Sequence, residues 1–229
     1  MKNKITWIIA ALSLIITAVA INFMPDKIPM HYNFAGEVDR YGSKFEMMIF
    51  PGITLLFAVF WMVLTRTFDR KLKSGAEEKE IAEIKANSKV IYIASIATMV
   101  FFLVTQLVFI HNVFKNGNAN NEESPFDFMT IEMAILGVLM IIMGNVMPKS
   151  KRNGMFGLRT PWSMANDRTW LACNRFGGVL ACVAGFMILL VALLFDGMMI
   201  IWITLGIVVV MSIAVIVYSY VAYKKWGRV

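Results

Sequence analysis

The chain has 229 residues, and 59% of them are hydrophobic, compared with about 45–50% in soluble domains. This composition excludes an ordinary soluble protein, and the apolar stretches described next leave no length for a separate soluble domain. The net charge of +7 would suit a nucleic-acid-binding protein, but the placement of the basic residues indicates another cause, and we expect no direct binding to nucleic acid.

Six long apolar stretches follow one another along the chain, separated by short charged segments. A helix needs roughly 20 apolar residues to cross a membrane core about 30 Å thick, and each stretch meets or approaches that length. The first is too long for the apolar core of a signal peptide and lacks a small-residue cleavage site, so we expect a retained anchor. The sequence therefore predicts an all-α polytopic membrane protein with six transmembrane helices, at residues 5–23, 47–64, 90–114, 128–147, 171–195 and 198–223.

The basic residues are sorted between the two sides of these helices. If the amino terminus is inside, seventeen Lys and Arg residues lie in the inner segments and four in the outer loops. This bias is the positive-inside signal of membrane proteins. We therefore predict that both termini are cytoplasmic and that the inner charges contact anionic lipid headgroups.

The first outer loop, residues 24–46, is the one sizeable external segment. Ile28, Met30 and Tyr32 alternate with other residues in the pattern of a strand. Turns are expected at residues 35–36 and 41–42, each of which ends in glycine. The loop is thus predicted to form a small extracellular hairpin.

The first inner segment, residues 65–88, carries charges of both signs. From residue 77 to residue 89 it is predicted to be a helix that continues the third span into the cytoplasm, with Ile81 and Ile84 as its apolar positions. An exposed, solvated helix explains such a charge run, and a docking surface for a soluble partner is the alternative.

The second inner segment contains Thr160 followed by Pro161, which is the pattern of an N-cap and a first helical residue. The helix predicted from there presents Trp162, Asn166 and Trp170 on one face. Because tryptophan favours the membrane–water boundary, we expect an interfacial helix that leads into the fifth span.

Ionisable and polar residues inside the spans are candidate functional residues. By depth, His111 and Glu132 belong to an outer cluster with His31. This cluster could bind a metal ion through two histidines and a carboxylate, but two histidines 80 residues apart are a weak signal, and we assign no metal.

A second, inner cluster is expected from Asn145, Asn174 and Arg175, together with the segment around Arg159. For both clusters the alternative is that the side chains simply extend to the headgroups. No nucleophile, phosphate-binding or metal-protease pattern occurs, so the sequence predicts neither an enzyme nor a cofactor. Inverted repeats with broken helices, which are typical of transporters, are also not found.

Two groups of residues resemble known families. The outer loop is similar to an amino-terminal domain of unknown function found in many bacterial membrane proteins of this size, and the second inner segment resembles the signature of the SdpI family. The two occur in the family's order, and the resemblance covers nearly all of the chain. The first group is residues 25–33, Gly36, Asp39, residues 41–44 and Pro51; the second is Asn153, residues 156–162, Trp170 and residues 174–175, with Ser163 and Met164 as a minor departure.

The resemblance implies a multi-pass immunity protein in the bacterial cytoplasmic membrane, which protects its cell against a secreted toxin that acts on the envelope. It also implies a possible second role, in which a small cytoplasmic DNA-binding repressor is held at the membrane. A small-molecule or ion transporter, and a membrane sensor without an immunity role, are the alternatives. The expected division is residues 1–66, a cytoplasmic loop at 67–89, and a four-helix domain at 90–229.

The resemblance and the loop positions together give the candidate residues. We expect the outer loop to face the toxin, with Pro25, Asp26, Pro29, His31, Asn33, Gly36, Asp39, Gly42 and Lys44. We expect the signature of the second inner segment to be structural, with Asn153, Phe156, Gly157, Arg159, Thr160, Pro161, Trp162, Trp170, Asn174 and Arg175.

Overall fold

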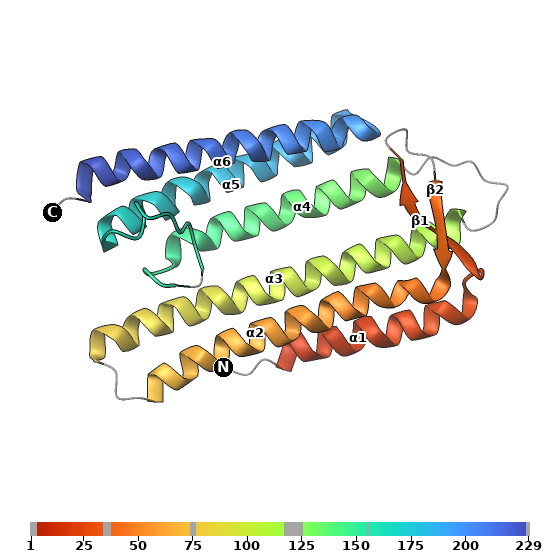
Figure 1. The fold of residues 1–229 in the computed structure, drawn as a ribbon, viewed down its shortest axis with the longest axis horizontal. Coiled ribbons are helices and arrows are strands. Elements are labelled where there is room, and N and C mark those ends of the chain that lie inside the picture. Colours follow the sequence, from red (N-terminus) through yellow and green to blue (C-terminus); the bar gives the residue numbers. More distant parts are fainter. Residues whose placement is uncertain (1–3, 34–37, 74–76, 117–125, 155, 228–229) are drawn as a thin grey trace.

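The computed structural model describes residues 4–33, 38–73, 77–116, 126–154 and 156–227. Within these ranges six helices are long and apolar enough to cross a membrane, which confirms the predicted spans. Figure 1 shows them side by side, with two short strands at one end. Below, "inner" and "outer" refer to the two sides of the membrane as the distribution of basic residues predicts them. The helices are α1 (Lys4–Ala20), α2 (Ile49–Lys73), α3 (Glu78–Asn116), α4 (Phe126–Val146), α5 (Asp167–Leu194) and α6 (Met198–Trp226).

The first three helices share one core, and apolar side chains from α1, α2 and α3 meet there. Ile9, Ala58, Ile91 and Met99 are at most 7% exposed in this cluster. The outward faces of the helices remain apolar, as expected where lipid rather than water surrounds the protein.

Helices α4 and α5 are held together by glycines. A Cβ atom placed on Gly144 would lie 2.6 Å from the carbonyl oxygen of Gly178, and one on Gly185 would lie 2.5 Å from that of Gly137. Such close backbone approach is a common way to pack helices in lipid, where no hydrophobic effect drives helices together. The α4–α5 pair is therefore fixed by the absence of side chains at these four positions.

Helix α3 is 39 residues long and contains neither glycine nor proline. It begins in the inner segment and continues without interruption through the membrane-spanning region (Figure 1). The prediction that a helix from residue 77 continues into the third span is confirmed.

The outer loop forms the predicted hairpin, from β1 (Lys27–Tyr32) and β2 (Val38–Ser43). The turn expected at residues 41–42 is wrong, because Tyr41 pairs with Pro29, and Gly42 with Ile28, inside the antiparallel ladder. The other expected turn, at residues 35–36, lies outside the described residues. Ile28 is fully buried in a cluster that includes the outer ends of α1 and α3.

Candidate functional site: the inner loop and the outer hairpin

The inner loop, defined here as residues 150–166, lies over the inner ends of α5 and α6. Its anchor is Asn174 in α5, which is fully buried and accepts a hydrogen bond of 2.8 Å from the Leu158 N–H. Trp170, one turn earlier, donates from its ring nitrogen to the Ser150 carbonyl at 2.9 Å. Gly157 has a φ of 108°, and a Cβ there would lie 2.5 Å from the Asn174 amide oxygen. Glycine, tryptophan and asparagine are thus required together at these positions.

Thr160 closes a single turn with Ser163 and does not begin a helix. The Thr160 N–H donates to the Ser163 hydroxyl at 2.9 Å, and the Ser163 N–H donates to the Thr160 hydroxyl at 3.0 Å. The Thr160 hydroxyl also donates to that of Ser219 in α6. The prediction of a helix from Thr160 is therefore wrong. Asn166 is extended, with φ −155° and ψ 175°, and caps α5, which begins at Asp167.

The three residues expected on one helical face are consequently separated. Trp162 makes an edge contact with Tyr220, with ring centres 5.2 Å apart. Asn166 donates through its side chain to the Trp226 carbonyl at 2.7 Å. Trp170 is only 2% exposed. Trp162 and Asn166 therefore join the inner loop to α6, whereas Trp170 joins α5 to the beginning of the loop.

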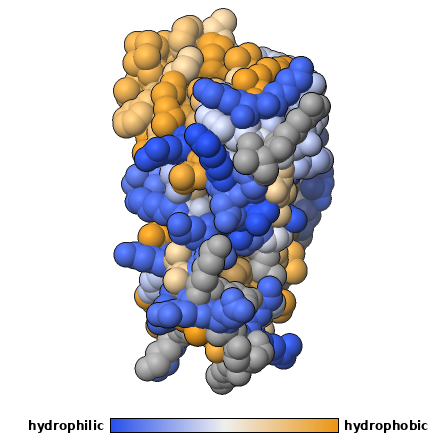
Figure 2. All heavy atoms as spheres, turned by 90° about the vertical axis from the view of Figure 1, so that its left-hand side faces the viewer, coloured by the Kyte–Doolittle hydropathy of each residue, from blue (hydrophilic) through white to orange (hydrophobic). Residues whose placement is uncertain are grey.

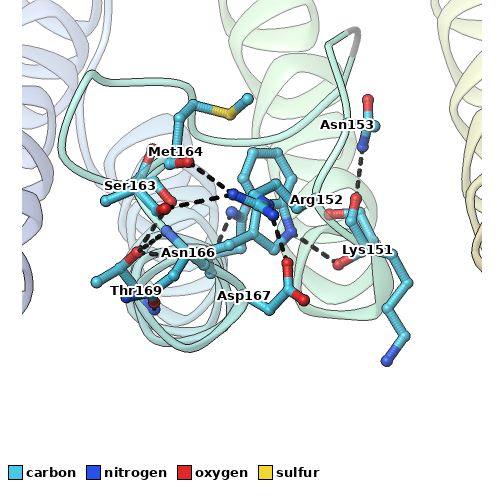
Figure 3. A network of polar contacts seen from close by, with 12 residues as sticks. Lys151, Arg152, Asn153, Ser163, Met164, Asn166, Asp167 and Thr169 are labelled. Atoms are coloured by element: carbon cyan, nitrogen blue, oxygen red, sulfur yellow. Dashed lines mark hydrogen bonds and ion pairs between the residues drawn. The ribbon is translucent and has the colours of Figure 1, made fainter. Parts of the chain in front are cut away.

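Arg152 joins the beginning of the inner loop to its end (Figure 3). Its Nε lies 2.9 Å from the Asp167 carboxylate, and its NH1 donates to the Met164 carbonyl at 3.1 Å. Beside it, Asn153 accepts from the Phe156 N–H at 2.8 Å. Sequence reasoning missed Arg152 and Asp167, because an arginine in a basic run is indistinguishable from a charge that only sets orientation.

The inner loop also contacts the first three helices. Asn87 in α3 is 4% exposed, and its side-chain oxygen accepts from the Lys151 N–H at 2.8 Å. Phe156 packs against the shared core of α1, α2 and α3. A half-polar cleft of about 240 Å³ lies at this junction, with Lys71, Glu83 and Asn153 in its lining. The loop therefore touches both halves of the molecule.

The expected inner cluster is formed only in part. Asn174 bonds to the Leu158 backbone as described, whereas Asn145, Arg159 and Arg175 are exposed. Within the described residues, no hydrogen bond or ion pair is found for these three side chains. Pro161 is exposed at the surface of the turn.

In the outer hairpin, several candidate residues hold the strands to one another. His31 Nδ1 lies 2.6 Å from the Asp39 carboxylate, and Lys44 Nζ lies 2.9 Å from that of Asp26. Gly42 is closely covered, since a Cβ there would lie 2.7 Å from Met30. The hairpin is thereby a braced unit.

The remaining hairpin candidates differ in their surroundings. Pro29 is buried, Pro25 is exposed, and Asn33 is partly exposed beyond the end of β1. Gly36 lies outside the described residues. Arg40, which the sequence did not single out, pairs with Glu46.

The expected outer cluster does not assemble in the described residues. His31 pairs with Asp39, His111 is exposed on α3, and Glu132 accepts a hydrogen bond of 2.9 Å from Thr105. Among the described residues, no three His, Cys, Asp or Glu side chains are grouped so as to hold a metal ion.

A polar cluster deep between α1, α2 and α3 was not anticipated from the sequence. Gln106 is fully buried and donates to the Ser13 carbonyl at 2.9 Å and to the Thr17 hydroxyl at 2.7 Å. Ser13 in turn donates to the Gln106 side-chain oxygen. The sequence did contain a signal for this cluster, because Gln106 interrupts an apolar stretch at about the same membrane depth as Ser13 and Thr17 in the first span.

Comparison with known proteins agrees with this arrangement. Residues 149–219, which include the whole inner loop, match the model described as the SdpI/YfhL protein family. The resemblance to the SdpI family is confirmed. Residues 8–55, which include the outer hairpin, match a domain of unknown function, DUF1648. These segments fall in the first and last parts of the predicted division, whose boundaries remain a prediction.

The SdpI-like character extends beyond the two matched segments. The chain is 25% identical to the "Immunity protein SdpI" of Bacillus subtilis (strain 168), across 98% of this chain and 97% of the relative. No solved structure matches the chain. With its six apolar helices, the chain is a multi-pass bacterial membrane protein, and its relative is named for immunity and not for an enzymatic activity.

Proposed function

We propose that this chain is a membrane immunity protein that protects its cell against a secreted toxin acting on the envelope. The observation that carries the proposal is the 25% identity to an immunity protein across 98% of the chain. Both matched segments also correspond to compact features of the fold, the outer hairpin and the inner loop. The similarity is therefore not confined to apolar spans, whose composition alone makes membrane proteins alike.

We propose that the outer hairpin is the surface that meets the toxin. It is braced by ion pairs and anchored by buried Ile28, and Tyr41 on β2 and Phe45, two residues beyond β2, are 62% and 65% exposed. Exposed aromatic side chains on a rigid support are typical of binding surfaces, because they bury much area at little entropic cost. A toxin made outside the cell would encounter this end first if the predicted orientation holds.

The test is survival of a toxin-sensitive bacterium that expresses the chain and is challenged with the sporulation-delaying toxin and related envelope-active peptides. Protection by the parent chain and its loss in a Tyr41→Ala, Phe45→Ala double variant would support the proposal. Phe186→Ala is the matched control, since Phe186 is 62% exposed on α5, away from the hairpin. Full protection by the double variant at equal protein level would contradict the assignment of the hairpin.

We further propose that the inner face holds a small cytoplasmic DNA-binding repressor when toxin is engaged. The supporting observation is the half-polar cleft between α2, α3 and the inner loop, with Lys71, Glu83 and Arg152 in its lining. Gly154 also lies in the lining, and a Cβ added there would meet no atom within 4 Å, so Gly154→Trp would place a large ring at the cleft. The amount of a DNA-binding protein that co-purifies with the parent chain should fall in the Gly154→Trp variant. An unchanged amount would contradict the cleft as its binding site.

A further inference from the structure

The inner end of the α5–α6 pair carries a cluster of aromatic rings with cations placed over them. The Arg168 guanidinium lies 5.4 Å from the centre of the Trp226 ring, and Lys225 Nζ lies 4.9 Å from the same ring. Lys224 Nζ lies 4.8 Å from the centre of the Tyr220 ring, which also contacts Trp162. We call this set of six residues the cation–aromatic collar: Trp162, Arg168, Tyr220, Lys224, Lys225 and Trp226.

Positive charge at the collar is not neutralised by any carboxylate among the described residues. In the sequence, residues 149–168 and 224–228 together hold eight basic residues and a single acid, Asp167. Asp167 is bound to Arg152. In the part of the chain that the structure describes, no carboxylate forms an ion pair with the three collar cations. By contrast, residues 65–89 hold seven basic and five acidic residues, so the excess of positive charge is much larger in the carboxy-terminal half.

The position of Arg168 is not explained by the stability of its helix. It lies in the first turn of α5, where the helix dipole disfavours a cation, whereas Lys224 and Lys225 in the last turn of α6 suit the dipole. The support beneath the cations is held at two points, since Asn166 donates to the Trp226 backbone carbonyl at 2.7 Å and the Tyr220 ring contacts Trp162. The three charges are therefore gathered on a prepared surface.

Next to the collar, the helix surfaces are apolar and open. Val217 and Val221 on α6 are 56% and 52% exposed, and Leu171 on α5 is 47% exposed. Figure 2 shows this end of the molecule, with hydrophilic residues over most of the face and apolar residues gathered at its upper edge, where Figure 1 places α6. A ligand at the collar therefore meets cations and an aliphatic surface at once.

We propose that the collar binds the phosphate group of an anionic phospholipid, whose acyl chains lie along Val217 and Val221. A phosphodiester supplies the missing negative charge, and charge-assisted hydrogen bonds from Lys and Arg to phosphate are strong. The apolar neighbourhood favours a lipid over a soluble anion, because acyl chains gain by covering it. The site is independent of the immunity function proposed above.

The test measures binding of phosphatidylglycerol and phosphatidylcholine to the full chain in neutral detergent, by native mass spectrometry. Phosphatidylglycerol should bind more tightly than phosphatidylcholine. The double variant Lys224→Gln, Lys225→Gln should weaken phosphatidylglycerol binding roughly 30-fold, which is the usual contribution of two basic residues near an anionic lipid surface. Both lysines are exposed and make no hydrogen bond in the described structure, so the variant should fold.

The matched control is Lys85→Gln, Lys89→Gln, which removes the same charge from exposed lysines on the same inner side. This control should retain phosphatidylglycerol binding. Equal weakening by both double variants would overturn the proposal in favour of a diffuse charge effect. Competition by inorganic phosphate at the same concentration would also overturn it, because a soluble anion would then suffice. No toxin is used, so the outcome is separate from that of the immunity assay.

Discussion

Substitution of Gly157 by alanine is the sharpest test of the inner loop. Its φ of 108° is a conformation that side-chain-bearing residues rarely adopt. A Cβ would lie 2.5 Å from the Asn174 side-chain oxygen and 2.9 Å from the Trp170 ring. Neither neighbour can retreat freely, because Trp170 is bound to Ser150 and both side chains are buried.

The expected cost follows from two contributions. A left-handed conformation costs a residue other than glycine about 1–2 kcal/mol. Displacement of Asn174 breaks its bond to the Leu158 N–H, and leaving buried polar groups unpaired costs about 1–3 kcal/mol. Gly157→Ala should therefore lower the free energy of unfolding by about 2–5 kcal/mol.

The assay is reversible unfolding in mixed detergent micelles, followed by tryptophan fluorescence. Gly154→Ala is the matched control, because nothing lies within 4 Å of a Cβ at that position. It should leave the free energy of unfolding within about 0.5 kcal/mol of the parent. A Gly157→Ala protein as stable as the parent, or an equal loss in both variants, would refute the close packing of Gly157 on Asn174 and Trp170.

Three further predictions use the same unfolding measurement. Gln106→Leu should cost about 1–2 kcal/mol, because it removes buried hydrogen bonds between α1 and α3; an unchanged free energy of unfolding would contradict this cluster. Gly144→Val should separate α4 from α5 and cost about 3 kcal/mol. Gly206→Val, at a position with open space, should cost less than about 1 kcal/mol, and similar losses in the two variants would contradict the glycine contact. Arg159→Ala should change stability by less than about 0.5 kcal/mol, because the side chain is exposed without a partner in the described structure, and a large loss would reveal a contact that the fold does not show.

The helical framework could be predicted from the sequence because membrane spans follow from local apolar length. The continuation of α3 below residue 90 and the alternation around Ile28 are equally local signals, and both predictions are confirmed. These features depend on periodicity and composition, which a single sequence contains in full.

The inner loop could not be predicted in detail because its conformation depends on side chains far apart in the sequence. Thr160 and Pro161 have the local pattern of a helix start, and the Thr160 hydroxyl does accept the capping hydrogen bond from the Ser163 N–H, but the turn is not continued, and α5 begins only at Asp167. The roles of Asn87 and Arg152 likewise appear only when the halves are brought together. Local propensity was overridden by tertiary hydrogen bonds.

The unbroken helix α3 gives the molecule a mechanical property. Val113, near its outer end, lies in the cluster that buries Ile28 of the hairpin, and Asn87, about 39 Å away along the axis, holds the inner loop. With no glycine or proline between them, the helix has no built-in hinge at which a kink could form. A displacement of the outer end must therefore reappear at Asn87, or be taken up by sliding of α3 against α2 and α4, so this stiff rod connects the two faces of the membrane.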